Sequence, residues 1–98
     1  MSDLNVVAVL KANSGSEAAL QDALSALVPP SRAEEGCVGY ELFRSAADAS
    51  TFVTIETWRS QADLEAHMQT PHIAAALQAL GGALDGAPAI HPLVRVDV

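Results

Sequence analysis

Residues 51–59 read TFVTIETWR and form the clearest predicted strand of the chain. Threonine, valine, isoleucine, phenylalanine and tryptophan dominate this stretch, and these residue types favour extended backbone. Side chains alternate between the two faces of a strand, which divides the stretch into two sets: Phe52, Thr54, Glu56 and Trp58, and Val53, Ile55 and Thr57. A second alternating stretch, 37–45, precedes it after a short loop, so the two should pair as an antiparallel hairpin.

The residues before this hairpin predict one strand and one helix. Residues 4–12 are rich in valine and leucine and should form the first strand. Ser14 with Glu17 has the spacing of a capping box, which predicts a helix beginning there. Because a proline disfavours the helical conformation of the residue before it, we expect Pro29 and Pro30 to end the regular run, with at most a short second turn as far as Glu34.

The residues after the hairpin predict two helical pieces and a last strand. Ser60 with Asp63 is a second capping box, and Thr70-Pro71 restarts the helix with proline at its first position. Residues 90–98 should form an edge strand, because Pro92 lacks the N–H that an inner strand would need. The resulting β-α-β-β-α-β order predicts a ferredoxin-like α+β fold.

Length and composition predict one domain, 1–98, that forms a homodimer. A chain of 98 residues fits a single domain. Half of its residues are hydrophobic, more than one small interior needs. Both helices should cover one face of the sheet, which leaves apolar side chains on the other face. We expect two copies to bury these faces against each other.

The charge and the N-terminal residues narrow the range of partners and the location. The net charge of −7 and the scattered basic residues argue against nucleic acid and against an anionic membrane surface. We expect a cytoplasmic location, since the sequence has no secretory leader and no apolar run long enough for a membrane span. The single cysteine, Cys37, allows no disulfide within the chain.

One segment resembles a known family. Residues 35–42 read EGCVGYEL, residues 56–58 read ETW, residues 65–68 read EAHM and residues 71–72 read PH. This order resembles the antibiotic-biosynthesis monooxygenase family and its quinol-monooxygenase-like members, which share an E-x-G-C pattern, a tyrosine in the second strand, E-x-W closing the third, and A-H and P-H in the helices that follow.

The resemblance implies a dimeric α+β barrel with a small-molecule pocket between sheet and helices. It also implies a cofactor-independent oxygenase, with no metal, flavin or haem, in which a deprotonated quinol or aromatic polyketide-like substrate reduces dioxygen itself. Haem degradation is disfavoured, because the haem-degrading branch has tryptophan at the place of His67 and an iron-binding histidine at the place of Leu77.

Six residues are candidates for the site. His67 is a candidate catalytic proton acceptor because histidine titrates near neutral pH, and the resemblance suggests Asn5 as a residue that holds substrate or oxygen. Tyr40, Trp58, His72 and Glu56 are candidate substrate-binding residues.

Each candidate also has a structural interpretation. His67 and His72 could brace the helix junction through the backbone or through Glu56, and their spacing matches no standard metal motif. Trp58 could be a core anchor. Glu56, if buried, should need an arginine or histidine partner.

Two other functions remain open on the sequence. The protein could be an isomerase or lyase acting on a small oxygenated metabolite, with His67 as a proton shuttle. It could instead be a non-catalytic dimeric module that binds a small hydrophobic ligand. Oxygen-independent turnover would indicate the first, and a pocket filled by its own side chains would indicate the second.

Overall fold

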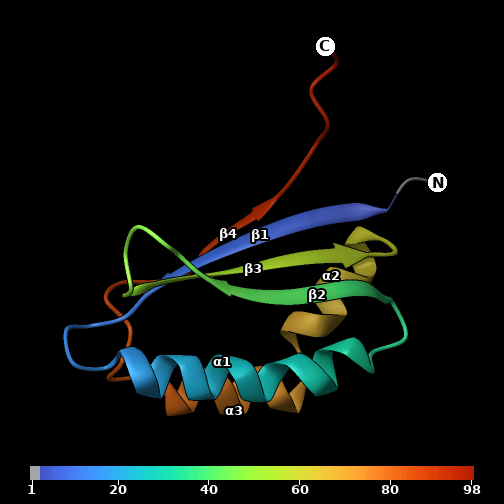
Figure 1. Ribbon diagram of the computed structural model, residues 1–98. Helices are drawn as coiled ribbons and strands as arrows, with labels where there is room; N and C mark the ends of the chain where they lie inside the picture. The colour runs from blue at the N-terminus through green and yellow to red at the C-terminus, as the bar shows by residue number, and fades with distance from the viewer. Residues whose placement is uncertain (1–2) are drawn as a thin grey trace.

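The computed structural model describes residues 3–98 and contains a four-stranded sheet with three helices (Figure 1). The elements in chain order are β1 (Leu4–Lys11), α1 (Glu17–Arg32), β2 (Cys37–Arg44), β3 (Thr51–Trp58), α2 (Gln61–Met68), α3 (Pro71–Ala79) and β4 (Ala89–Pro92). No helix within residues 3–98 combines the length and the apolar character needed to cross a membrane.

The sheet has the strand order β2-β3-β1-β4, and every neighbouring pair is antiparallel. The helices lie together on one side of this sheet, and the other side is open (Figure 1). This arrangement confirms the predicted ferredoxin-like α+β fold.

The core fills the space between the sheet and the helices. Val6, Phe52 and Trp58 point from the strands toward the helices, and each is at most 1% exposed. Leu20 of α1 and Leu80, directly after α3, meet them from the helical side. The face predicted for residues 52, 54, 56 and 58 is therefore the buried, helix-facing side of the sheet.

Helix α1 differs from its prediction at both ends. It begins at Glu17 with Ser16 as the capping residue, so the expected capping box at Ser14 does not form. The reason is tertiary: the Asn13 side chain donates to the carbonyls of Gly82 and Leu84, which ties the preceding turn to the loop before β4. A helix beginning at Ser14 would have to break these contacts.

The two prolines do not end α1, which corrects the expectation that the regular helix stops at Pro29 and Pro30. The helix continues through Pro29 and Pro30 to Arg32, and the Ala33 N–H donates to the Pro29 carbonyl at 3.1 Å. Tertiary contacts outweigh the two lost N–H groups: Leu24 and Leu27 of the same helix are buried in the core, and Arg32 donates to the carbonyl of Tyr40 at 2.9 Å.

A bulge in β2 changes which side chains face the core. The register against β3 shifts between Cys37 and Gly39, as expected for an extra residue in one strand. Tyr40 is buried and Cys37 packs against the same cluster, whereas Val38 is 59% exposed. Strict alternation over residues 37–45 would put Val38 and Tyr40 on the same face, and the bulge breaks this alternation at Val38.

Strand β4 is shorter than predicted. Only Ala89–Pro92 pairs with β1, and the chain then leaves the sheet (Figure 1). The Leu93 N–H still donates to the Asn5 carbonyl, but Val94, Val96 and Val98 are at least 74% exposed. The expected strand over 90–98 therefore stops after Pro92. Continued in the same register, residues 95–98 would lie beyond Leu4, where β1 begins.

Candidate functional site

A small apolar cavity lies between the sheet and the helices, where the resemblance implied a pocket. Its volume is about 70 Å³, and its polar side chains are those of Tyr40, Thr54, Glu56 and His67. Half-exposed Met68 and Leu77 also line it, on the helical side of its rim. The cavity therefore combines an apolar wall, a carboxylate, a phenol and an imidazole.

His67 is the central polar group of this cavity. It lies near the end of α2 and is only 2% exposed. Its Nδ1 lies 2.6 Å from Oε2 of Glu34. An ionised carboxylate accepts from Nδ1–H, and this tautomer leaves the lone pair on Nε2. Since the ring lines the cavity, Nε2 is the nitrogen available to a molecule bound there.

His72 contacts the same carboxylate oxygen from α3. Its Nε2 lies 2.8 Å from Glu34 Oε2. Thr70 caps α3 by accepting from the Ile73 N–H, as the sequence predicted, and this holds the helix start beside α2. His72 lines a separate groove between α1 and α3 rather than the cavity. Both histidines do brace the helix junction, but through Glu34 and not through Glu56.

Sequence reasoning missed Glu34, which joins the two histidines. The extended α1 carries the chain to this residue, and the Cys37 N–H donates to its carbonyl at 3.0 Å. Gly36 makes a close approach possible, because a Cβ there would lie 2.2 Å from the Asp63 side chain on α2. The signal was present in the sequence: Glu34 is the glutamate of the E-x-G-C pattern.

Glu56 is buried without an arginine or histidine partner, which corrects the expectation for this residue. Its Oε1 accepts from Trp58 Nε1 at 2.8 Å, and its Oε2 accepts from Thr54 Oγ1 at 2.6 Å. Two hydrogen bonds to the carboxylate offset the cost of burying it. Trp58, which is fully buried, packs in the core beside the cavity and holds Glu56 in place.

Tyr40 lines the cavity beside His67. The two ring centroids are 5.7 Å apart, and Trp58 lies 4.5 Å from the His67 ring on the same measure. Burial, and then the nearby Glu56 charge, raises the pKa of Tyr40 far above the usual value of a phenol. The Tyr40 hydroxyl therefore remains protonated at neutral pH and can donate a hydrogen bond.

Asn5 lies apart from the other five candidates. It is paired in register with Thr57 on the open face of the sheet, and Thr57 Oγ1 donates to its Oδ1 at 3.1 Å. Asn5 and Thr57 line a hollow next to residues 93–96. The structure thus gathers Tyr40, Glu56, Trp58, His67 and His72 on the helical side and places Asn5 on the opposite side.

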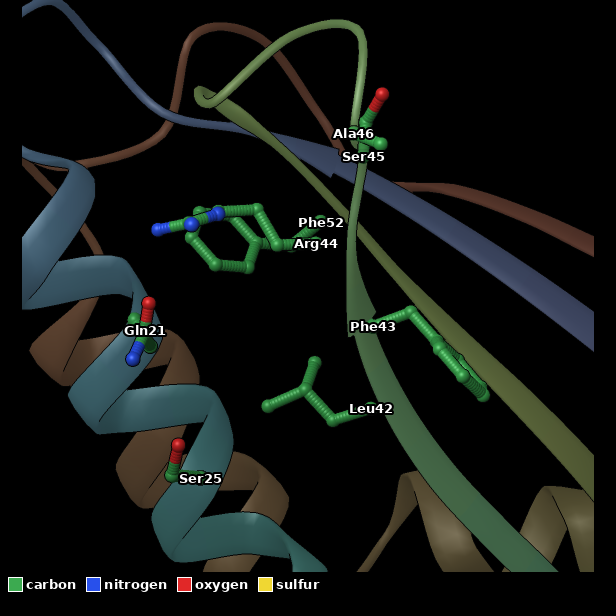
Figure 2. Close-up of a pocket in the computed structure, with 8 residues that line it drawn as sticks. All are labelled: Gln21, Ser25, Leu42, Phe43, Arg44, Ser45, Ala46 and Phe52. Carbon is green, nitrogen blue, oxygen red and sulfur yellow. The ribbon is translucent and has the colours of Figure 1, made fainter.

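Another hollow, larger than the cavity at His67, lies between α1 and the end of β2, away from the histidines (Figure 2). It measures about 480 Å³. Gln21 and Ser25 border it from the helix, and Leu42 points toward it whereas Phe43 points away on the other side of the strand (Figure 2). It contains none of the candidate residues and no proton acceptor comparable with His67, so the smaller cavity is the better candidate site.

The fold and this cavity define a class of protein: a ferredoxin-like domain with a carboxylate-oriented histidine in an apolar pocket. Comparison with known families gives its membership. Residues 4–79 match the family model described as "Antibiotic biosynthesis monooxygenase". This chain belongs to that family.

Individual relatives agree with the family assignment. The chain is 37% identical over 89 residues to the "Probable quinol monooxygenase YgiN" of Escherichia coli, covering 81% of this chain and 86% of that protein. It is 37% identical over 71 residues to the "Putative monooxygenase Rv0793" of Mycobacterium tuberculosis, covering 72% and 69%. The crystal structure of PA3566 from Pseudomonas aeruginosa superposes with a TM-score of 0.92 at 36% identity, covering 99% of this chain and 97% of that one.

Proposed function

We propose that this protein is a cofactor-independent monooxygenase that oxidises a quinol or an aromatic polyketide-like molecule with dioxygen. The observation that carries the proposal is the Glu34–His67 pair. The carboxylate lies 2.6 Å from Nδ1, and the ring lines an apolar cavity, which leaves Nε2 as the nitrogen free to accept a proton there. This is the arrangement that a general base for a phenolic hydroxyl requires.

In the proposed reaction, Nε2 of His67 takes the proton of the substrate hydroxyl. The electron-rich anion then reduces dioxygen, and the radical pair recombines to form a C–O bond. The protonated His67 ring returns its proton to the resulting peroxide, which gives a hydroperoxide. Loss of water, made from the terminal O–H and the hydrogen on the same carbon, leaves a carbonyl, so that one atom of dioxygen enters the product and the other leaves as water. The protonated Tyr40 hydroxyl is available to stabilise the oxyanion.

Substrate binding requires the cavity to widen. A volume of about 70 Å³ is far below the roughly 300 Å³ or more of common ligand pockets. Met68 and Leu77 are 41% and 49% exposed at the rim, and α2 ends beside them. We propose that movement of these rim side chains, and of the short break between α2 and α3, admits the aromatic ring.

We further propose that the functional unit is a homodimer. The open face of the sheet carries Val9, Val53 and Ile55, and Phe43 is 50% exposed on the same face. The exposed valines after Pro92 extend this apolar surface along the tail. A second copy of the chain is the partner with a matching surface, because a two-fold interface pairs the same patch on both subunits.

The activity is tested with the purified protein and a panel of hydroquinones and anthrone-like phenols under oxygen. We expect oxygen-dependent turnover that falls by roughly a hundredfold or more in His67→Asn, since a positioned general base contributes about 10²–10⁴-fold. His91→Asn is the matched control, because His91 lies on the open face and outside the cavity. Absence of turnover across the panel, or equal activity of His67→Asn, would refute the proposal.

One observation favours a second candidate function. The narrowness of the cavity suits a module that binds a small hydrophobic ligand without converting it. Tight binding of an aromatic ligand in the cavity, with no oxygen uptake and no effect of His67→Asn on the ligand's chemical fate, would support this alternative.

A further inference from the structure

We propose that Glu34, His67 and His72 form a binding site for a divalent transition-metal ion, and that an ion bound there prevents His67 from acting as a base. The first part stands on the geometry of the three residues. The second part rests on the proposed function.

The three ligand atoms already converge. Nδ1 of His67, Nε2 of His72 and a carboxylate oxygen of Glu34 all lie within 4.8 Å of one another. Ligands around a tetrahedral zinc ion, at bonds of about 2.0–2.1 Å, lie about 3.3 Å apart. The two contacts of 2.6 and 2.8 Å to Glu34 need only lengthen by a fraction of an ångström to admit an ion.

Solvent can complete the coordination. The side chains of Glu34 and His72 are 16% and 23% exposed, whereas His67 is 2% exposed. The site is therefore closed on the His67 side and open on the other, which gives an entry path and room for a water ligand.

The ion would lie outside the substrate cavity. His67 is the only one of the three residues that lines the cavity among the residues described, and it reaches the other two through Nδ1. His72 borders the separate groove between α1 and α3. An ion at Nδ1 is thus on the far side of the ring from a substrate at Nε2, which suits a regulatory or stabilising role rather than direct contact with the substrate.

The donor set indicates the class of metal. Two imidazoles and one carboxylate suit Zn²⁺ and its first-row neighbours Co²⁺, Ni²⁺ and Cu²⁺, whereas Mg²⁺ and Ca²⁺ prefer sites made of oxygen ligands alone. We therefore expect Zn²⁺ to bind and Mg²⁺ to leave the site empty.

Metal binding would change the tautomer of His67. Opposite an ionised Glu34, a neutral His67 ring donates its Nδ1 proton and keeps a lone pair on Nε2. Coordination uses the Nδ1 lone pair, so the proton of the neutral ring must move to Nε2. The nitrogen that faces the cavity then becomes a donor and cannot accept a proton from substrate. The same exchange in His72 moves its proton to Nδ1.

Binding is tested first, without reference to activity. The full chain is freed of metal with a chelator and titrated with Zn²⁺ by calorimetry, and with Co²⁺ by visible absorption. We expect one ion per chain and binding weakened at least about tenfold in His72→Ala. His91→Ala is the matched control and should bind as the unaltered chain does. No binding at micromolar Zn²⁺, or equal binding by His72→Ala, would overturn the proposed site.

Inhibition is tested second, on any quinol that the protein turns over. Zn²⁺ should lower the activity of the unaltered chain with the concentration dependence measured by calorimetry. In His72→Ala, compared with its own activity without zinc, the same fractional inhibition should need at least about tenfold more zinc. Binding without inhibition would refute the switch and keep the site. Absence of turnover before zinc is added would instead refute the proposed function, so the two failures are distinguishable.

Discussion

Glu34 Oε2 lies 2.6 Å from Nδ1 of His67, although 33 residues separate the two in the chain. The contact joins the turn that follows α1 to the last turn of α2. It fixes both the orientation of the ring and the nitrogen that faces the cavity. Glu34 is therefore a positioning residue, which acts on a substrate through His67.

Replacing this carboxylate should lower the catalytic rate more than it weakens substrate binding. In Glu34→Gln the amide can still contact Nδ1, but it stabilises the developing imidazolium less well. We expect kcat to fall by about tenfold, a part of the contribution of a general base, with little change in KM. Steady-state kinetics on a converted quinol measure both.

A double variant separates positioning from an unrelated effect. If Glu34 acts through His67, Glu34→Gln combined with His67→Asn should be no slower than His67→Asn alone. Additive losses in the double variant would show that Glu34 acts by another route.

The buried Glu56 network should be sensitive to loss of one donor. Trp58→Phe removes the N–H that reaches Glu56 Oε1 at 2.8 Å, and a buried acceptor left without a partner costs about 1–3 kcal/mol. Glu56→Gln should cost less, because its amide oxygen can still accept from Trp58 and its amide nitrogen can donate to Thr54. Trp58 is the only tryptophan, so urea unfolding of both variants should be followed by circular dichroism. A larger loss in Glu56→Gln than in Trp58→Phe would contradict this account of the network.

Much of the fold could be predicted because local patterns and tertiary packing agree. The alternation over residues 51–59 and the caps at Ser60 and Thr70 lie where local chemistry decides the structure, and β3, α2 and α3 follow them. The prediction was wrong where long-range contacts oppose a local signal. Pro29 is a local helix breaker, yet α1 continues through it to Arg32, which is tied to β2 by its hydrogen bond to the Tyr40 carbonyl.

The candidate site could be predicted only in part for the same reason. His67, Tyr40 and Glu56 reach one cavity because alternation and helical spacing place them on inward faces. Glu34 follows a proline-rich segment with no periodic pattern, so its contact with the histidines depends on the helical extension of α1. Asn5 was assigned by resemblance, and the alternation of β1 directs it to the open face.

Gly36 should not tolerate a side chain. A Cβ at this position would lie 2.2 Å from Cγ of Asp63, and Asp63 is held by Arg59 at 2.9 Å. We expect Gly36→Ala to destabilise the fold by about 1–3 kcal/mol, the usual cost of overpacking, and to move Glu34 away from the histidines. The control is Gly82→Ala, because a Cβ there meets no atom within 4 Å. Equal urea midpoints for the two variants would contradict the close packing at Gly36.

Asp48 should make stability depend on pH in the acid range. Its carboxylate accepts from the Ser50 N–H and hydroxyl and from the Thr51 hydroxyl, and these bonds lower its pKa to about 2. Because the folded-state pKa lies below the unfolded value of about 3.9, the stabilisation is complete above pH 4 and disappears as the pH falls toward 2. Asp48→Ala should therefore lower Tm at pH 7 and lose this effect near pH 2.

The control for Asp48 is Asp85→Ala, since the side chain of Asp85 makes none of the hydrogen bonds found within residues 3–98. Thermal melts between pH 2 and pH 7 compare the two variants. A Tm difference for Asp48→Ala that stays constant down to pH 2 would show that the carboxylate charge is not the cause.

The open sheet face should determine the oligomeric state. Ile55 is 48% exposed near the centre of this face, opposite Val7 of β1. A stable interface buries roughly 800 Å² per partner. A lysine at position 55, opposite Glu41 of β2, would carry a charge into this interface at a desolvation cost that an ion pair repays only in part. We therefore expect the unaltered chain to have twice its 10.2 kDa mass in light scattering at micromolar concentration, and Ile55→Lys to be monomeric.

Leu77→Lys is the matched control, because Leu77 is 49% exposed but lies on α3, on the opposite side of the sheet. The Leu77→Lys variant should remain dimeric. A monomeric unaltered chain, or a dimer that survives Ile55→Lys, would refute the proposed interface.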